Sequence, residues 1–413
     1  MDQKILDLAK EVEARIAPRF AEIDEVAKIN TEKVLNAFRE ARVSDMHFAG
    51  TYGYGHNDIG RDTLDEIFAK VFGAESGLVR IGMVSGTHAI ACALFAACDP
   101  GKTLLSISGM PYDTIQSSIG IVGNYPGSLK YYGVDFDCVD LLPDSSPDIE
   151  AIKKRAADPK VGAVAIQRSR GYSTRKTLTV AQIAEMIAAV KEVNPTACVF
   201  VDNCYGEFTE LHEPSEFGAD LMAGSLIKNP GGGLAPTGGY IVGKAEYVER
   251  AAARLAAPGL GSDCGATMGC NMQLFRGFFM APHTVAQALK TVVFCAGMLE
   301  ELGYKSNPGV FEQRSDIVQI IELGTPEKLC AFCRGIQQGS PVDSFTTPVP
   351  GDLDGYADQV VMASGAFVQG STIELSCDGP MREPYAAYLQ GGLTYESGRL
   401  GILYAINEMM QEF

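Results

Sequence analysis

Three short segments of this sequence carry side chains that could together hold a flat, negatively charged ligand. The first is Ser85-Gly86-Thr87-His88, which lies between an apolar segment and an apolar helix-forming one. Glycine lets the backbone approach a ligand closely, and the first turn of a helix presents unpaired N–H groups at its positive end. The segment is therefore typical of a phosphate-binding turn, although Ser-Gly-Thr is also a common helix cap.

The other two segments each end an apolar stretch in a charged residue. Asp202 closes Val199-Phe-Val-Asp202-Asn203, and Lys228 lies in Ser225-Leu-Ile-Lys228-Asn-Pro-Gly231-Gly-Gly233. A buried aspartate needs a positive partner, such as a protonated pyridine nitrogen. A lysine in an apolar setting has a lowered pKa, so its neutral amine can form a Schiff base, and the glycines would leave room for a flat ligand. Taken alone, Asp202 also fits a loop acid or helix cap, and Lys228 an exposed lysine.

The segments between these residues alternate short apolar strands with amphipathic helices. We expect strands at 78–84, 103–106, 161–167, 198–202, 220–225 and 239–242. We expect helices at 63–72, 88–98 and 180–193, a helix from 245, and a long helix at 284–301. This alternation predicts an α/β domain with a mostly parallel sheet, in which ligands bind at the carboxyl ends of the strands.

The two ends of the chain differ from this pattern. Residues 1–40 have apolar positions at helical spacing and predict two helices, while the last ~110 residues predict strands near 317–321 and 372–375 and a final helix from 398. We therefore predict an N-terminal helical arm (1–48), a large α/β domain (49–300) and a small C-terminal α+β domain (301–413). A chain of 413 residues is long enough for such a division at about 150 residues per domain.

Composition excludes several classes of protein. The chain is 46% hydrophobic and 21% charged, which is ordinary for a globular protein, and 34 Lys+Arg against 51 Asp+Glu give a net charge of −17. Such an acidic surface repels nucleic acid and anionic membranes, so we expect neither as a partner. No apolar run approaches the ~18 residues of a membrane span, and the N-terminus lacks the apolar core of a signal peptide.

Cysteine usage favours a cytoplasmic protein without a metal site. Eleven cysteines are scattered through the chain, many inside apolar runs, as reduced and buried cysteines are. Cys330-Ala-Phe-Cys333 has no second pair or histidine nearby, so we interpret it as packing on a helix face in preference to metal or redox chemistry. His47 and His56 are nine residues apart, which is not a metal-binding pattern.

The order of the three segments carries a resemblance. A phosphate turn, then Asp202, then Ser-x-x-Lys about 26 residues later, resembles the pyridoxal phosphate enzymes of the aspartate aminotransferase type I fold. The sequence is most similar to their cystathionine lyase and methionine γ-lyase group, and within it to the bacterial "aluminium resistance" branch. The resemblance covers most of the chain and is strongest at 50–239. It implies a large parallel-sheet domain and a small C-terminal domain around pyridoxal 5′-phosphate.

The resemblance implies roles for matching residues around the cofactor. Lys228 would be the Schiff-base lysine and Ser225 a phosphate ligand, although Ile227 replaces a hydroxyl residue of the family's Ser-x-Thr-Lys. Asp202, in Asp-Asn-Cys-Tyr, would pair with the pyridine nitrogen and keep the ring an electron sink.

The same resemblance places residues around the phosphate and over the ring. The backbone N–H groups of Gly86 and Thr87 would hold the phosphate. Tyr112, in Ser-Gly-Met-Pro-Tyr-Asp-Thr, falls where the family has a tyrosine stacked on the ring, and its phenol could move a proton at the leaving group.

A glycine-rich segment implies an active site shared between subunits. Thr51-Tyr-Gly-Tyr-Gly-His-Asn57 resembles the family's Tyr-Ser-Arg-x-x-Asn-Pro-Thr, which reaches the phosphate of a neighbouring subunit. Tyr52 fits the tyrosine, Tyr54 replaces the arginine, and Arg61 is a candidate substitute. The implied assembly is a dimer with shared sites, and a tetramer is expected from the resemblance.

The arginine that binds the substrate carboxylate in the family is missing from its usual segment. Arg-Leu-Ser-Val-Gly of the family appears here as Glu374-Leu-Ser-Cys-Asp. Arg382 is the nearest candidate, unless it forms a surface ion pair with Glu383 or Asp378. Arg168 and Arg170, in Gln-Arg-Ser-Arg-Gly-Tyr, follow a strand near the ring's expected position and are the other candidates.

The resemblance implies a lyase that breaks a carbon–sulfur bond of a small-molecule sulfur amino acid, by β- or γ-elimination. In this hypothesis Lys228 forms the Schiff base and then removes the substrate's α-proton. Two alternatives remain open. One is an aminotransferase or aldolase on the same fold, and the other is a pyridoxal-phosphate-binding homeostasis protein with little turnover.

Overall fold

The computed structural model describes residues 1–123, 125–353 and 356–412. Its first sheet consists of β1 (Ser76–Arg80), β2 (Thr103–Ser106), β3 (Asp135–Cys138), β4 (Val161–Gln167), β5 (Cys198–Asp202), β6 (Leu221–Ser225) and β7 (Gly239–Gly243). The order across the sheet is β1-β7-β6-β5-β4-β2-β3. All neighbours are parallel except β7, which is antiparallel to β1 and β6. The predicted α/β domain with a mostly parallel sheet is confirmed.

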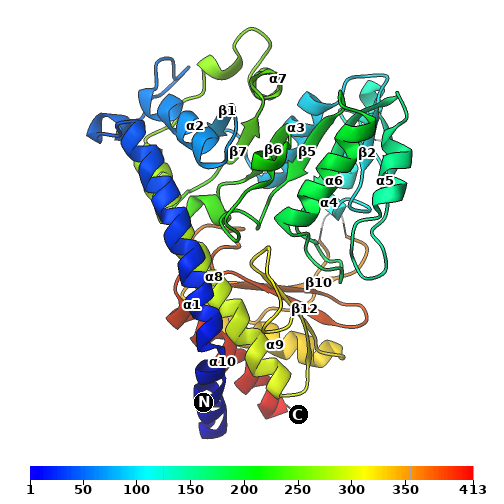
Figure 1. Cartoon of the computed structure of the whole chain (residues 1–413). Coiled ribbons are helices and arrows are strands. Elements are labelled where there is room, and N and C mark those ends of the chain that lie inside the picture. The colour runs from blue at the N-terminus through cyan, green and yellow to red at the C-terminus, as the bar shows by residue number, and fades with distance from the viewer. Residues whose placement is uncertain (124, 354–355, 413) are drawn as a thin grey trace.

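Strands β5, β6 and β7 are buried at every position, because the sheet is covered on both faces by helices. These helices are α2 (Ile59–Val71), α3 (Gly86–Ala97), α4 (Asp113–Ile119), α5 (Ile149–Ala156), α6 (Val180–Val193) and α7 (Ala245–Leu255). Side chains alternate along the strands: Val199 and Val201 of β5 pack in the core with α5 and α6, whereas Phe200 packs in the core with α3 and α7. The result is the helix–sheet–helix arrangement in the upper part of Figure 1.

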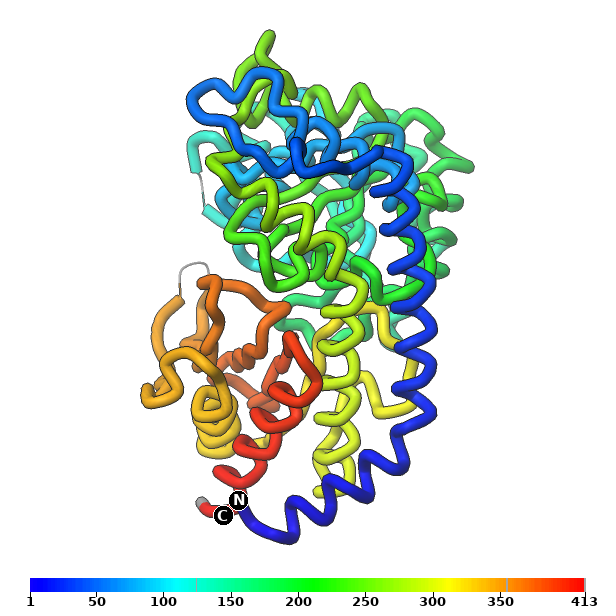
Figure 2. The backbone as a smooth tube through the Cα atoms, turned by 90° about the vertical axis from the view of Figure 1, so that its left-hand side faces the viewer, coloured from blue at the N-terminus to red at the C-terminus, as the bar shows by residue number. Residues whose placement is uncertain are grey.

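Two long helices run side by side along the molecule. They are α1 (Gln3–Glu40) and α8 (Asn271–Glu301), which pack against each other and reach from the large sheet to the second one (Figures 1 and 2). The prediction of two helices before residue 40 is wrong, because α1 continues through Pro18. A proline removes one helical hydrogen bond. The helix nevertheless continues, because apolar residues before and after Pro18, from Ile5 to Ala37, lie along one side of it and are buried in the core.

The second sheet is antiparallel and lies below the first in Figure 1. Its strands are β8 (Lys305–Asn307), β9 (Val318–Glu322), β10 (Val360–Ser364), β11 (Ser376–Pro380) and β12 (Ala386–Gln390), in the order β10-β11-β12-β9-β8. Helices α9 (Pro326–Gln338) and α10 (Tyr395–Glu412) pack against each other beside it. The strand expected at 372–375 begins instead at Ser376, where pairing with Ser364 and Gln390 starts.

Short 3-10 helices lie between the longer elements, at Asp45–Phe48, Lys130–Tyr132, Pro214–Phe217, Asn229–Gly231 and Gly261–Asp263. Cys330 and Cys333 both lie on α9, and Cys333 is buried with its Sγ 3.9 Å from that of Cys377. No helix in the described part of the chain is long and apolar enough to cross a membrane.

Candidate active site

A cavity of about 540 Å³ lies where the carboxyl ends of the large sheet face the second sheet. Strands β4, β5 and β6 run parallel, so residues that end them meet at one edge, as expected for an open α/β sheet. The cavity brings together six residues that the sequence singles out: Gly86, Thr87, Tyr112, Asp202, Ser225 and Lys228.

The first turn of α3 forms one wall of the cavity. Ser85 caps this helix, its Oγ accepting a hydrogen bond of 3.1 Å from the backbone N–H of His88. A Cβ atom at position 86 would lie 3.2 Å from Cβ of Ser225 and 3.8 Å from Nζ of Lys228, so glycine keeps this space open.

Ser225 adds an unsatisfied donor to the same wall. Its Oγ is buried and has no hydrogen-bond partner within the described residues. An unpartnered hydroxyl beside a helix N-terminus and an open glycine fits a phosphate oxygen. The residues present therefore fit the phosphate group of pyridoxal phosphate.

Asp202 and Lys228 face this cavity from neighbouring strand ends. The Asp202 Oδ1 atom accepts a 3.1 Å hydrogen bond from the Cys204 backbone N–H, and the residue is 7% exposed. Burial raises the pKa of Asp202, while the positive charge of Lys228 acts to lower it. A buried carboxylate with a cation as its main attractive neighbour fits the place of a protonated ring nitrogen.

The Lys228 amine does not have the low pKa that its apolar sequence setting suggests. Burial disfavours its charged form, but the acidic groups around it, Cys204, Tyr205 and Asp202 among them, raise its pKa above the ordinary value. An apolar setting alone would lower this pKa, and the acidic neighbours of the amine together reverse the direction of the shift.

The side chain of Asn229 fixes the backbone next to Lys228. The Asn229 amide donates to the carbonyl oxygens of Tyr205 (3.0 Å) and Glu207 (2.9 Å). The following glycines serve packing: a Cβ at Gly231 would lie 1.8 Å from the Leu226 carbonyl oxygen, and one at Gly232 would lie 2.3 Å from that of Gly277 on α8. The glycine run thus seats the lysine turn against α8, and the structure does not place it in the cavity.

Tyr112 precedes α4 and points into the cavity. Its backbone N–H donates to Oε1 of Gln167 (2.9 Å), and its hydroxyl lies 3.4 Å from Oγ1 of Thr87. Burial, together with the nearby Asp202 charge, raises the pKa of the Tyr112 phenol. The phenol is therefore protonated at neutral pH and able to donate.

Tyr205 is a cavity residue that the sequence reasoning missed. Its ring lies beneath Lys228, with Nζ 4.0 Å from the ring centroid. Its position in Asp-Asn-Cys-Tyr, where the related motif ends in phenylalanine, was the available signal.

The second sheet supplies the opposite wall, and its residues were also missed. Val318 of β9, Met362 of β10, Asp378 of β11, and Tyr388 and Gln390 of β12 line the cavity. Strands β10 and β12 were not expected from the sequence, so their inward faces could not be assigned.

The three candidate arginines lie outside this cavity. Arg168 is completely buried, and its guanidinium pairs with Glu210 (2.8 Å) and Glu213 (3.4 Å) in the core of the large domain. Arg382 pairs with Asp358 at 2.9 Å, in place of the Glu383 or Asp378 considered from the sequence. Glu374 turns away to accept the backbone N–H groups of Phe367 and Val368.

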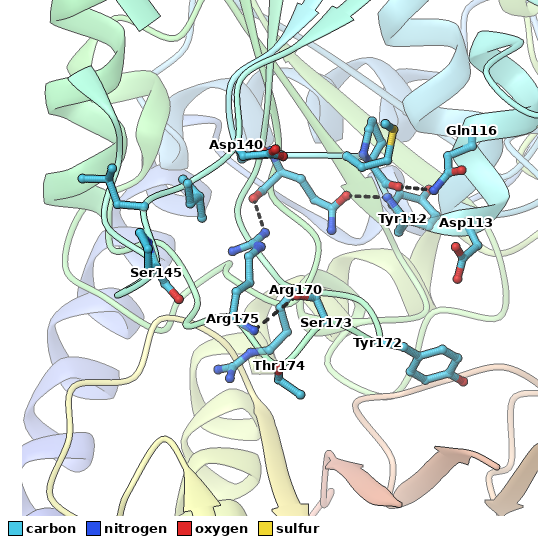
Figure 3. A pocket seen from close by; sticks show the side chains of 18 of the residues that line it. Tyr112, Asp113, Gln116, Asp140, Ser145, Arg170, Tyr172, Ser173, Thr174 and Arg175 are labelled. Atoms are coloured by element: carbon cyan, nitrogen blue, oxygen red, sulfur yellow. Dashed lines mark hydrogen bonds between the residues drawn. The ribbon is translucent and has the colours of Figure 1, made fainter. Parts of the chain in front are cut away.

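Arg170 and Arg382 line a neighbouring cavity of about 560 Å³, which Figure 3 shows from close by. This second cavity shares Tyr112, Asp113, Gln167 and Tyr172 with the Lys228 cavity. Arg175 also lines it and donates to the Gln167 carbonyl oxygen at 2.8 Å (Figure 3). Arg170 and Arg382 thus line a cavity that adjoins the one that holds Lys228.

Tyr52 and Tyr54 lie on the surface and do not reach the Lys228 cavity of their own chain. They are 71% and 73% exposed. Arg61, the candidate substitute for the missing arginine, is buried and donates to the carbonyl oxygens of Gly55 (2.6 Å) and Gly265 (3.1 Å), so its guanidinium joins two loops of its own chain.

No group of three or more His, Cys, Asp or Glu residues is arranged to hold a metal ion in the ranges that the structure describes.

Comparison with known proteins places these observations in context. The chain is 50% identical over 405 residues to the uncharacterized protein YnbB of Bacillus subtilis, covering 98% of this chain and 96% of that one. It is 46% identical to a carbon–sulfur lyase involved in aluminium resistance from Clostridium novyi, with a TM-score of 0.95 over 98% of this chain and 96% of that chain. A structure from Listeria monocytogenes, described as a candidate cystathionine beta-lyase involved in aluminium resistance, is 46% identical, with a TM-score of 0.96 over 98% and 100% of the two chains.

A more distant structure tests the fold separately. A methionine gamma lyase from Micromonospora echinospora, CalE6, is 19% identical with a TM-score of 0.57 over 87% of this chain and 93% of that chain. This likeness confirms the predicted fold of the pyridoxal-phosphate-dependent transferase type. The family model for methionine gamma-lyase matches residues 5–410. The predicted resemblance is confirmed, and the chain belongs to the methionine gamma-lyase family.

Proposed function

We propose that this protein is a pyridoxal-phosphate-dependent carbon–sulfur lyase that eliminates a thiol from a sulfur amino acid. One observation carries the proposal: Lys228, Asp202 and the open Gly86–Ser225 wall line a single cavity at the carboxyl edge of the large sheet. The relatives named as carbon–sulfur lyases support the same reaction class.

When bound, pyridoxal phosphate supplies an electron sink that stabilises negative charge on the substrate's α-carbon. The backbone N–H groups of Gly86 and Thr87 and the Ser225 hydroxyl would hold its phosphate. Asp202 would hold its ring nitrogen in the protonated form. The Lys228 amine would hold the group in place and later take the α-proton of the substrate.

The protonated phenol of Tyr112 would act at the other end of the substrate. A leaving thiolate needs a proton, and a donor whose pKa is raised by burial keeps one at neutral pH. The whole reaction consumes one water and yields a thiol, ammonia and a keto acid, without net oxidation or reduction. The cavity of about 540 Å³ leaves room for a side chain beyond the sulfur.

We also propose that two copies of the chain share their active sites. Tyr52 and Tyr54 are far more exposed than tyrosines usually are, which favours a contact with another copy. A tetramer made of two such dimers is part of the same proposal.

The test is the absorption spectrum of the purified protein, before and after borohydride, followed by mapping of the reduced peptide. We expect a visible band that borohydride removes, with the adduct on Lys228. The loaded protein should release thiol and ammonia together from a sulfur amino acid, and Lys228→Ala should lose this turnover. Full turnover by Lys228→Ala would contradict the proposal, and amino transfer without thiol would favour an aminotransferase.

A further inference from the structure

One face of the second sheet carries a single charged side chain into the cavity. The register of β10, β11 and β12 places Met362 opposite Asp378 and Asp378 opposite Tyr388, and all three residues line the cavity. Gln390 and Val318, which also pair across strands, complete this face. Asp378 is thus an acid set among uncharged neighbours.

Asp378 has hydrogen-bond partners but no cation. Gln390 Nε2 donates to its Oδ2 at 3.2 Å, and the Tyr172 hydroxyl forms a further hydrogen bond. No ion pair among the described residues includes it, and the one cationic side chain in the described cavity lining is Lys228, which faces Asp202. Burial raises the pKa of Asp378 to about 7, so its charge is poorly compensated.

A cluster of three tyrosine rings lies next to this carboxyl, because the Tyr172 hydroxyl forms a hydrogen bond with Asp378 and Tyr388 pairs with it across the strands. The Tyr172 ring centroid is 5.1 Å from that of Tyr388 and 5.2 Å from that of Tyr356, and all three residues line the cavity. The negative faces of aromatic rings attract ammonium groups, most strongly where water is excluded. A carboxylate beside such rings is a cation-binding arrangement.

We propose that Asp378, Tyr172, Tyr356 and Tyr388 bind an ammonium group in the substrate's side chain, beyond the sulfur atom. This inference rests on the proposed function and narrows its substrate to sulfur amino acids with a second amino group. The α-amino group has its own place at Lys228, so the second ammonium is a separate requirement.

A carboxylate is a poorer occupant of this subsite. Asp378 would repel it, and the Arg382 guanidinium belongs to the adjoining cavity, where it pairs with Asp358. If Asp378 instead stayed protonated and donated a hydrogen bond to a carboxylate, an asparagine could replace it through its amide N–H. The variant Asp378→Asn therefore separates the two occupants.

The first test measures binding without turnover. L-Lysine and L-2-aminoheptanoate have side chains of equal length, lack sulfur, and differ in the terminal ammonium. By calorimetry on the pyridoxal-phosphate-loaded protein, we expect lysine to bind at least about tenfold more tightly, a difference of ~1.4 kcal/mol. Asp378→Asn should abolish this preference. The control is Asp113→Asn, which changes another acid of the cavity lining and should retain the preference. Equal binding of both ligands, or a preference that survives in Asp378→Asn, would overturn the inference.

The second test uses substrates that can eliminate. S-(2-Aminoethyl)-L-cysteine and S-propyl-L-cysteine are matched in length, and thiol release gives kcat/KM for each. We expect kcat/KM to be about tenfold or more higher for the aminoethyl compound. In Asp378→Asn this preference should disappear, because kcat/KM falls for the aminoethyl compound and not for the propyl compound. If both compounds react equally, the inference fails while the lyase proposal stands. If neither releases thiol but lysine still binds preferentially, the lyase proposal fails while the ammonium subsite stands.

Discussion

The Nζ atom of Lys228 lies 4.0 Å from the centroid of the Tyr205 ring. Tyr205 holds a left-handed backbone conformation, with φ of 72°, which is uncommon for a residue other than glycine. Such strain persists where the surroundings enforce it, and the Asn229 amide does so by donating to the Tyr205 carbonyl oxygen at 3.0 Å. The turn after Asp202 therefore presents an aromatic face to the lysine.

Removal of this ring should lower the pKa of Lys228. A desolvated ammonium–ring contact stabilises the charged amine by about 2 kcal/mol, which corresponds to roughly 1.5 pKa units. In Tyr205→Leu more of the amine is neutral at pH 7. Because the neutral amine is the form that attacks a carbonyl, pyridoxal phosphate should associate about thirtyfold faster with this variant than with the parent protein. Stopped-flow absorbance across pH 6–10 measures the rate, and below the pKa of Lys228 the ratio of the two rates gives the difference in pKa between the variant and the parent protein.

Tyr205→Phe is the matched control, because it keeps the ring and removes only the hydroxyl. Its rate and pKa profile should follow the parent protein. If Tyr205→Leu and Tyr205→Phe shift the profile equally, the hydroxyl and not the ring acts on Lys228.

Gly86→Ala should weaken cofactor binding without unfolding the protein. The added Cβ would lie 3.2 Å from Ser225 Cβ and 3.8 Å from Lys228 Nζ, so it enters the proposed phosphate space. We expect the dissociation constant of pyridoxal phosphate to rise at least about tenfold, as for the loss of ~1.4 kcal/mol. Fluorescence titration of the cofactor-free protein measures it.

Gly82→Ala tests whether this effect is local. Gly82 lies in the same loop before α3, and a Cβ there meets nothing within 4 Å. Its affinity should match the parent protein's. Unchanged affinity of Gly86→Ala for pyridoxal phosphate would mean that the phosphate does not bind at this wall.

Several strands and helices around the large sheet were predicted well because their signals are local. Strands β4 and β5 and helix α6 begin and end where the apolar pattern predicts, since each alternates with polar turn residues. The segments that contain Gly86, Asp202 and Lys228 meet at one edge of the large sheet, because parallel strands bring their carboxyl ends together. Lys228, Asp202 and Gly86 could therefore be placed from spacing and resemblance.

The second sheet was poorly predicted because its contacts are not local. Strand β10 follows a segment of turns, and β11 is too polar to read as a strand until its pairing with β10 and β12 is known. Asp378 consequently appeared in the sequence as a possible surface partner of Arg382. The pairing of β11 with β10 and β12 shows that Asp378 lies on the face of the sheet that lines the cavity.

The stability of the protein should fall between about pH 5 and 8 through Glu207, a completely buried residue. Its Oε1 accepts the Tyr240 hydroxyl at 2.7 Å, its Oε2 has no partner, and burial raises its pKa to about 8. Between its ordinary pKa and 8, the unfolded chain loses this proton while the folded chain keeps it. The free energy of unfolding therefore decreases as pH rises through this window and stays lower above it.

Glu207→Gln removes this titration while it keeps an oxygen for Tyr240. We expect its stability relative to the parent protein to increase by roughly 2–4 kcal/mol from pH 5 to 9, measured by urea unfolding of the cofactor-free protein. Glu185→Gln, at an exposed position on α6, is the control and should show no such change. A stability difference for Glu207→Gln that is independent of pH would mean that Glu207 is charged throughout.

Active sites shared between subunits predict complementation between two inactive variants. Lys228→Ala removes the amine of its own cavity, and Tyr52→Ala removes a side chain that is 71% exposed and absent from that cavity. If Tyr52 serves the neighbouring copy, a mixed dimer has one cavity with both changes and one cavity with neither. Refolding the two variants together should therefore restore lyase activity, up to about one intact site per mixed dimer.

A mixture of Lys228→Ala and Asp202→Ala proteins is the control. Each cavity takes both of these residues from its own chain, so both sites of every mixed dimer are damaged. Activity restored in the first mixture and not in the second would place Tyr52 in the partner's site, whereas no recovery in either would confine each site to a single chain.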